Sequence, residues 1–293
     1  MEKPELKDFA TKAYNILHNN KTIYSRSKEI ISSLFQNDKE YNLDLVIFRL
    51  TLIDSYYSTQ INSKRLFGID ELADEIVRIS NGSDAVLINK CEEFLKAPYS
   101  TNDIKDLFQH QKYGIHKTGE PAGQAPSLIS KYLYFLMKYK FPIYDNLAID
   151  SYNKIKSKYE FDIQKLKKEF DISYFDNLKQ LNICSGINNY EKLDNLLWLL
   201  GKITQGSLSI IIDMNTYVEL TQKANVNTKI ANIKAKNSKE KDKRKKDKRN
   251  VDDLIQEYIS NDINNLNEIF KDKDLIKFFE YSLQLKNQKK QES

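Results

Sequence analysis

The stretch "SLISKYLYFLMKYKFPIYD" covers residues 127 to 145 and decides the fold of the middle of the chain. Its apolar residues recur at helical spacing, and Pro142 ends the helix because a residue before proline is disfavoured in the α region. Asp145 follows and is a good N-cap for a helix predicted over residues 146 to 158. Lys131 and Asp145 therefore have two open interpretations: parts of an ordinary helix stop and cap, or a catalytic pair.

The position of Lys131 on its helix is also ambiguous. The core stripe contains Ile129, Tyr132 and Leu133, which places Lys131 on the opposite side, facing either water or a cleft between helical layers. A helix of about nine residues, from Lys131 to Tyr139, rises roughly 13 Å. Contact with Asp145 therefore requires the segment after the helix to fold back.

Composition sets the fold class. The chain has 293 residues, of which 40% are hydrophobic and 11% aromatic, so it can bury a sizeable core. It has only 8 Gly and 5 Pro, which is little material for the tight turns of a many-stranded protein. We therefore predict a mostly α fold. Helical periodicity is found over residues 5–18, 25–36, 43–59, 69–79, 84–96, 127–140, 146–158, 191–203 and 207–222.

The predicted organisation has three parts. A helical body covers residues 1–222, a basic linker covers 223–250, and a C-terminal helical segment covers 251–293. The last segment contains two short amphipathic helices, with Leu254 and Ile255 on one apolar stripe.

Several protein classes are disfavoured. No apolar run approaches the roughly 20 residues that cross a bilayer, and the first residues lack the apolar core of a signal peptide, so we expect a cytoplasmic protein with no membrane partner. Cys91 and Cys184 are too few for a disulfide scaffold and are predicted to be buried thiols. His110 and His116 lack an accompanying ligand set. We therefore expect neither a metal nor another cofactor.

Positive charge is concentrated in one tract. Residues 236 to 249, "KNSKEKDKRKKDKR", hold nine Lys or Arg against three Asp or Glu, a net charge of +6 in a chain whose total is +5. The tract has no apolar residue and cannot bury a face. It is either a solvated linker or an electrostatic contact to nucleic acid, since clustered cations gain from counterion release. In the second interpretation Lys243, Arg244, Lys245 and Lys246 contact DNA.

The least helical stretch lies directly before the opening helix. Residues 113 to 127, "YGIHKTGEPAGQAPS", contain three of the eight glycines and two of the five prolines. A glycine-bearing turn that leads into a helix N-terminus presents free N–H groups to a phosphate. Lys117, Gly119 and Gly123 are therefore candidate DNA contacts, and an ordinary surface loop is the alternative.

A second helix carries an unusual carboxylate. In "LDLVIFRLTLIDSYYSTQI", residues 43 to 61, Asp54 lies on the apolar stripe, where it needs a hydrogen-bond partner or a functional pocket. Tyr57 and Gln60 at the end of this helix are candidates for contact with DNA bases. Ordinary packing is the alternative for the tyrosine.

The order of these pieces resembles the helix-hairpin-helix DNA glycosylase superfamily. The resemblance covers residues 43 to 203: an apolar helix with a polar end, a glycine-bearing hairpin running into "SLISKYLYFLMKYKFPIYD", and a last helix reading "LDNLLWLLGK". The chain is also similar to uncharacterised bacterial proteins that share "YST" and "SKY…FPIYD" signatures. The resemblance implies a helical glycosylase-like body that acts on DNA.

The resemblance also implies roles for two residues. Asp145 matches the catalytic aspartate of the family, whose charge stabilises the cationic sugar formed as the base leaves. Bifunctional members carry a Schiff-base lysine about 18 to 20 residues before that aspartate, whereas Lys131 lies 14 residues before Asp145. Lys131 replaces that nucleophile, or the protein is monofunctional, or the fold is kept without chemistry. The iron–sulfur cluster of some members needs four cysteines and is excluded here.

Three functions stay open at this point. The first is a DNA glycosylase that excises a damaged or modified base. The second is a non-catalytic nucleic-acid-binding helical module, with a role in defence against foreign DNA. The third is a helical interaction protein without a nucleic-acid partner.

The basic tract gives a first prediction. Deleting residues 236 to 249 should weaken binding to duplex DNA at low salt and flatten its salt dependence, because nonspecific affinity follows the number of phosphates neutralised. Titrations at several salt concentrations measure both effects. Unchanged binding across the salt series would exclude a role of the tract in DNA contact.

Overall fold

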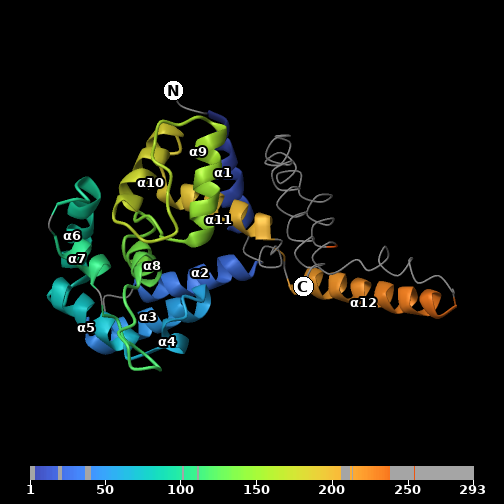
Figure 1. Ribbon diagram of the computed structural model, residues 1–293, viewed down its shortest axis with the longest axis horizontal. Coiled ribbons are helices and arrows are strands. Elements are labelled where there is room, and N and C mark those ends of the chain that lie inside the picture. Colours follow the sequence, from blue (N-terminus) through green and yellow to red (C-terminus); the bar gives the residue numbers. More distant parts are fainter. Residues whose placement is uncertain are drawn as a thin grey trace. The chain divides into compact units, whose positions relative to one another are not determined.

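The computed structural model describes residues 4–18, 22–36, 41–100, 102–110, 112–205, 212, 214–237 and 254. Twelve helices and a sheet of two short antiparallel strands form this part of the chain (Figure 1). The prediction of a mostly α fold is confirmed. The elements are α1 (Pro4–Leu17), α2 (Ile23–Leu34), α3 (Leu43–Tyr57), α4 (Ile61–Lys64), β1 (Arg65–Leu66), α5 (Gly68–Ser80), α6 (Asp84–Lys96), α7 (Asp103–Gln109), β2 (Ile115–His116), α8 (Pro126–Leu136), α9 (Asn146–Lys158), α10 (Ser173–Cys184), α11 (Tyr190–Gln205) and α12 (Met214–Asn237).

The described residues belong to two compact units. The first holds the residues up to Ala10 and those from Ser27 to Trp198; the second holds Thr11–Arg26 and the residues from Leu199 onward. Helix α12 continues through residue 223, where the basic linker was predicted to begin. The tract residues Lys243, Arg244, Lys245 and Lys246 lie outside the described residues, as does the C-terminal segment apart from Leu254. The predicted domain boundaries remain a prediction.

The nine predicted helices all correspond to helices of the structure, with ends shifted by a few residues and a larger shift for α12. Three helices, α4, α7 and α10, were missed, as were the two strands. Within the described residues, no helix combines the length and the apolar character needed to span a membrane.

An aromatic cluster forms the centre of the first unit. It joins Phe94 of α6, Phe108 of α7, Phe141 after α8 and Phe175 of α10, and all six pairs of rings have centroids 4.7 to 6.2 Å apart. Offset and edge-to-face contacts at such distances add about 0.5–1.5 kcal/mol per pair to the burial of the rings. Because Phe141 belongs to this cluster, the segment that leads to Asp145 is fixed to the core.

Helix α8 is buried on every side rather than on one stripe. It packs against α3, α6 and α7 and lies in the middle of the first unit (Figure 1). All residues from Leu128 to Leu136 are buried, including Lys131, which is 2% exposed. The interpretation in which Lys131 faces water is therefore wrong, because a second layer of the protein covers the side of the helix opposite the predicted core stripe.

Candidate functional site

Lys131 and Asp145 meet inside the first unit. The Nζ atom of Lys131 lies 3.6 Å from Oδ2 of Asp145, and the two side chains are 3% and 21% exposed. Lys131 also donates a hydrogen bond of 2.7 Å to Oγ of Ser127, one helical turn earlier on α8. Lys131 thus has two polar partners, which a buried ammonium group requires.

Asp145 also caps helix α9, as predicted. Its backbone is extended, and its Oδ1 accepts a hydrogen bond of 2.7 Å from the backbone N–H of Leu147. One carboxylate oxygen therefore serves the helix N-terminus, and the other faces Lys131. The cap and the contact with Lys131 are therefore compatible in one geometry, and a catalytic role of the pair stays a prediction.

Two hydrogen bonds hold the segment that folds back between α8 and α9. The N–H of Tyr144 donates to Oγ of Ser130 on α8 at 2.9 Å, and the hydroxyl of Tyr174 on α10 donates to the carbonyl of Ile143 at 2.7 Å. Both bonds lie among buried residues and use backbone groups that would otherwise lack partners. They return the chain across the helix end and bring Asp145 to Lys131.

A second ion pair lies within the same unit. Lys28 of α2 is 3% exposed and pairs with Glu191 of α11, which is 15% exposed. Its Nζ lies 4.1 Å from the ring centroid of Tyr139 and 5.4 Å from that of Tyr134, so two aromatic faces also stabilise the cation. Burial lowers the pKa of Lys28, and the charge and hydrogen bond of Glu191 oppose this effect.

Asp194 adds a third carboxyl group. It follows Glu191 by three residues on α11, so both side chains share one face of the helix. Burial raises the pKa of Asp194 to about 7; the charge of Asp145 adds to this effect, whereas Lys28 and Lys131 oppose it. Asp194 therefore interacts electrostatically with the charged groups of both ion pairs. We call Lys28, Lys131, Asp145, Glu191 and Asp194 the charge cluster.

The charges of the cluster do not balance. Two lysines face three carboxyl groups, and among the described residues neither a hydrogen bond nor an ion pair to the carboxylate of Asp194 is found. Its surroundings are apolar on the side where it lines a small cavity with Pro142 and Ile143. A carboxyl group without a donor in such surroundings keeps its proton to higher pH, which is the physical cause of the raised pKa.

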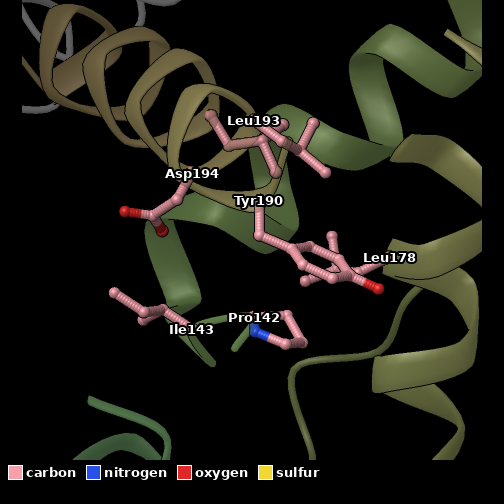
Figure 2. A pocket seen from close by; sticks show the side chains of 7 residues that line it. Pro142, Ile143, Leu178, Tyr190, Leu193 and Asp194 are labelled. Atoms are coloured by element: carbon pink, nitrogen blue, oxygen red, sulfur yellow. The ribbon is translucent and has the colours of Figure 1, made fainter. Parts of the chain in front are cut away.

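The cavity beside Asp194 is small. Figure 2 shows Asp194 and Tyr190 projecting from α11 to opposite sides, with the tyrosine ring beside Leu178 and the carboxyl group of Asp194 on the side of Ile143. Its volume of about 10 Å³ is at the lower limit for one water molecule. This cavity does not admit a nucleobase, and neither Lys131 nor Asp145 lines it.

Tyr57 borders the charge cluster. It is half-buried, its ring packs against Phe135 at 5.9 Å between centroids, and its ring centroid lies 5.7 Å from Nζ of Lys131. Burial raises the pKa of Tyr57, and the charges of Asp194 and Asp145 add to the shift. The predicted DNA-contacting tyrosine therefore packs beside the candidate catalytic lysine.

The structure separates Gln60 from Tyr57. Gln60 is exposed, has a left-handed backbone with φ of 64°, and lines an open groove of about 430 Å³ that is bordered by polar residues at the end of α3. Asp54 lies at the same groove, where it accepts hydrogen bonds from the hydroxyl of Thr59 and from the N–H groups of Ile61, at 2.9 Å, and Asn62, at 3.1 Å. Asp54 is thus a structural acid that caps α4, as its alternative interpretation required.

The glycine-bearing loop turns back on itself, with hydrogen bonds of 2.8 Å from the N–H of His116 to the carbonyl of Glu120 and from the N–H of Ala122 to the carbonyl of Gly114. Residues of β1 and β2 pair, and Arg65 donates hydrogen bonds to the carbonyls of Tyr113, Gly123 and Gln124 at 2.9 to 3.1 Å. Gly114 has φ of +86°, and a Cβ there would lie 2.7 Å from the carbonyl oxygen of Leu66, so only glycine fits.

The candidate DNA contacts of this loop are open to solvent. Lys117 and Gly119 are exposed and Gly123 is half-buried; both glycines have positive φ. The prediction of a loop is therefore confirmed, and DNA contact stays a prediction.

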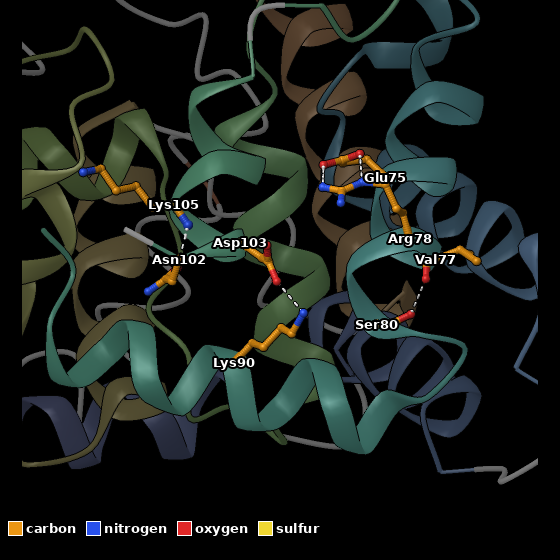
Figure 3. Close-up of polar contacts among 8 residues, drawn as sticks. All are labelled: Glu75, Val77, Arg78, Ser80, Lys90, Asn102, Asp103 and Lys105. Atoms are coloured by element: carbon orange, nitrogen blue, oxygen red, sulfur yellow. Dashed lines mark hydrogen bonds and ion pairs between the residues drawn. The ribbon is translucent and has the colours of Figure 1, made fainter. Parts of the chain in front are cut away.

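The ion pairs on α5, α6 and α7 differ from the charge cluster. Arg78 pairs with Glu75 three residues earlier and is 62% exposed, and Lys90 pairs with Asp103, with side chains 27% and 39% exposed (Figure 3). Exposed pairs of this kind contribute about 0–1 kcal/mol to stability. The ion pairs of the charge cluster are more buried than these, so a structural or functional role must account for them.

A metal centre is not found in the described part of the chain. No group of three or more His, Cys, Asp or Glu side chains there is arranged to hold a metal ion. Cys91 is buried, and burial raises the pKa of its thiol. Cys184 is half-buried.

Comparisons with known proteins found no match. No protein family model matches this chain, no curated protein matches it, and no solved structure matches its fold. The site must therefore be interpreted from its own geometry.

The raised pKa of Asp194 gives a second prediction. Below about pH 4 the carboxyl group of Asp194 is protonated in both the folded and the unfolded chain. From about pH 4 to 7 only the unfolded chain loses this proton. The free energy of unfolding therefore falls as the pH rises through this range. Asp194→Asn cannot ionise. Its melting temperature should exceed that of the wild type at pH 8, and the difference should shrink toward pH 4.

Thermal unfolding followed by circular dichroism at pH 4 to 8 measures this difference. Asp150→Asn is the matched control, because Asp150 is 49% exposed and pairs with Lys168 at 3.5 Å, outside the charge cluster. A difference between Asp194→Asn and the wild type that stays constant with pH would contradict the raised pKa.

Proposed function

We propose that this chain is a helix-hairpin-helix DNA glycosylase-like enzyme that excises a damaged or modified base from DNA. The observation that supports this proposal is the buried pair of Lys131 and Asp145 at the start of α9, with 3.6 Å between Nζ and Oδ2. The resemblance in sequence matches Asp145 to the catalytic aspartate of that superfamily.

The carboxylate of Asp145 is held in an orientation in which it could stabilise a positive charge. The Leu147 N–H holds one of its oxygens, and the other faces Lys131 in a site that is mostly closed to water. When the bond between a base and its sugar breaks, positive charge develops on the sugar. A fixed carboxylate in surroundings of low dielectric constant stabilises that charge without having to reorganise.

In this proposal Lys131 is the nucleophile. Its amine, once deprotonated, carries a lone pair that can attack the cationic sugar carbon and form a Schiff base after ring opening. Lys131 lies one helical turn further along α8 than Ser127, which belongs to the region where bifunctional family members carry their lysine. The direct contact with Asp145 compensates for the shorter sequence spacing, because both groups would face the same sugar carbon.

The small cavity beside Asp194 favours a second candidate function. A volume of about 10 Å³ does not hold an extruded base, and neither Lys131 nor Asp145 lines this cavity, so base excision here requires side chains near the pair to move when DNA binds. A nucleic-acid-binding module on the same scaffold needs no such pocket. In that case the charge cluster would be a structural element only.

Asp145→Asn tests the catalytic role. Asn caps a helix about as well as Asp, so folding and DNA binding should persist, whereas single-turnover base release should fall by at least about 100-fold, as when one charge-stabilising group is removed from an active site. The assay uses duplexes that carry different lesions. Asp150→Asn on the same helix is the control and should retain activity.

Base release at the wild-type rate in Asp145→Asn would show that Asp145 is a cap and nothing more. DNA binding by a wild type that releases no base would favour the non-catalytic module.

Lys131→Ala tests the nucleophile. The wild type should form an enzyme–DNA adduct that borohydride traps, and the variant should lose the adduct together with base release, because no other amine is paired with Asp145 in the described residues. Lys140→Ala, an exposed lysine in the same segment, is the control. Retained base release without adduct in Lys131→Ala would identify water as the nucleophile.

A further inference from the structure

Three apolar side chains are exposed together at one end of the first unit. Leu66 on β1 is 51% exposed, its partner Ile115 on β2 is 37% exposed, and Phe67, directly after β1, is 64% exposed. Residues directly opposite each other in an antiparallel pair have their side chains on the same face. Helices α4 and α5, which flank this segment in the chain, lie at the end of the unit away from α9 and α10 (Figure 1). We call Leu66, Phe67 and Ile115 the apolar patch.

Phe67 has a backbone conformation that is strained for an aromatic residue. Its φ is +60°, in the left-handed region. The surrounding backbone fixes this conformation: the carbonyl of Phe67 accepts a hydrogen bond of 3.0 Å from the N–H of Glu71, and a Cβ on Gly68 would lie 2.9 Å from Cγ2 of Ile61. The ring, in contrast, is mostly exposed and adds little to the packing. A strained residue with an exposed aromatic side chain points to contact with a partner.

Positive charge surrounds the apolar patch. The two segments that carry it, residues 60–67 and 112–124, hold four Lys or Arg and one Glu, a net charge of +3, whereas the chain without its basic tract sums to −1. Asp70 and Glu71 belong to the first turn of α5, where negative charge offsets the helix dipole. A cationic surface suits an anionic partner. Three of its cations are exposed lysines: Lys64, Lys112 and Lys117.

We propose that the apolar patch and its lysines bind a single strand of DNA, with one base stacked on the ring of Phe67 and the neighbouring phosphates contacted by the three lysines. Proteins bind single strands by combining exposed aromatic rings with a cationic surface, because every base has a face that can stack. In a duplex these faces are covered by neighbouring base pairs, and reaching them requires unstacking. An exposed ring therefore favours an unpaired strand. That the strand is DNA rests on the proposed function; that it is single-stranded rests on this surface.

The groove at the end of α3 adjoins the same segment of the chain. Ser63 on its wall precedes Phe67 by four residues, and its volume of about 430 Å³ is in the range of small-molecule sites. Gln60 and Asn62 also line it, and their side-chain amides make no hydrogen bond within the described residues. Amides both donate and accept, so they can pair with the edges of unstacked bases. The groove thus offers hydrogen bonds to nucleotides next to the one on Phe67.

The experiment measures binding of the full-length chain to fluorescein-labelled strands by fluorescence anisotropy. The probes are a strand of about 12 deoxythymidines, a uridine RNA strand and a blunt DNA duplex of the same length. The wild type should bind the DNA strand more tightly than the duplex. Phe67→Ala should weaken binding to the DNA strand about 10-fold, as for the loss of one stacked base, and Phe67→Trp should restore it. Phe48→Ala is the matched control, because Phe48 on α3 is 52% exposed and belongs to neither segment.

The lysines are tested through the salt dependence of binding. Replacing Lys64, Lys112 and Lys117 together by Ala should make the slope of log affinity against log salt concentration less steep by about 2, because each phosphate contact on a single strand contributes about 0.7. The control removes three exposed lysines from other parts of the first unit: Lys96, Lys165 and Lys167.

Three results would overturn the inference. They are equal affinity of Phe67→Ala and the wild type for the DNA strand, tighter binding of the duplex than of the DNA strand, and tighter binding of the RNA strand than of the DNA strand. Self-association that Phe67→Ala abolishes, in a wild type that binds no strand, would instead identify a second copy of the chain as the partner of the apolar patch.

The inference and the proposed function can fail separately. A wild type that binds the strand through Phe67 but releases no base would overturn the glycosylase proposal alone, because no residue of the apolar patch belongs to the charge cluster. Circular dichroism checks the fold of each variant, and Phe67→Ala should melt close to the wild-type temperature because its ring is exposed. If Phe67→Ala does not fold, the lysine variant and the comparison of strand with duplex still decide.

Discussion

The contact between Lys131 and Asp145 is the constraint on which the site depends. A buried ammonium group costs several kcal/mol unless a counter-charge and hydrogen-bond acceptors surround it. The chain provides these by folding back after α8, where Phe141 enters the aromatic cluster and Tyr144 is bonded to Ser130. The fold of the segment between α8 and α9 and the polar centre of the first unit therefore require each other.

The helical fold was predictable from the sequence, and the missed elements have a physical explanation. Helices with a clear apolar stripe were found, whereas α10 buries Asn177 and Asn182 alongside its apolar residues, so its periodicity is weak in sequence. Helix α4 has only four residues and depends on the cap from Asp54. Such elements are stabilised by tertiary contacts, which a single sequence does not display.

The site was predictable only in part, for a related reason. Asp145 was singled out because a helix stop and a resemblance to a family pattern coincide there, whereas Lys131 departs from the family spacing; the catalytic role of both residues stays a prediction. Asp194 was missed although it interrupts an apolar stripe between Leu193 and Leu197, the same signal that had identified Asp54. That signal is ambiguous, because Asp54 proved to be a helix cap. Only the distant partner of each carboxylate, a neighbouring N–H or a lysine of another helix, distinguishes a structural acid from a functional one.

The end of α8 shows how the two ion pairs are connected. Lys138 and Tyr139 both have left-handed backbone conformations, with φ of 50° and 68°, which cost non-glycine residues about 1–2 kcal/mol each. The hydrogen bond of 2.7 Å from the Tyr139 N–H to the Tyr134 carbonyl and the contact of the Tyr139 hydroxyl with Ser32 hold this turn. The turn places the Tyr139 ring against Lys28 at 4.1 Å. Helix α8 thus carries Lys131, and the turn after it contacts Lys28, so both lysines that lower the pKa of Asp194 lie against this helix or the turn that follows it.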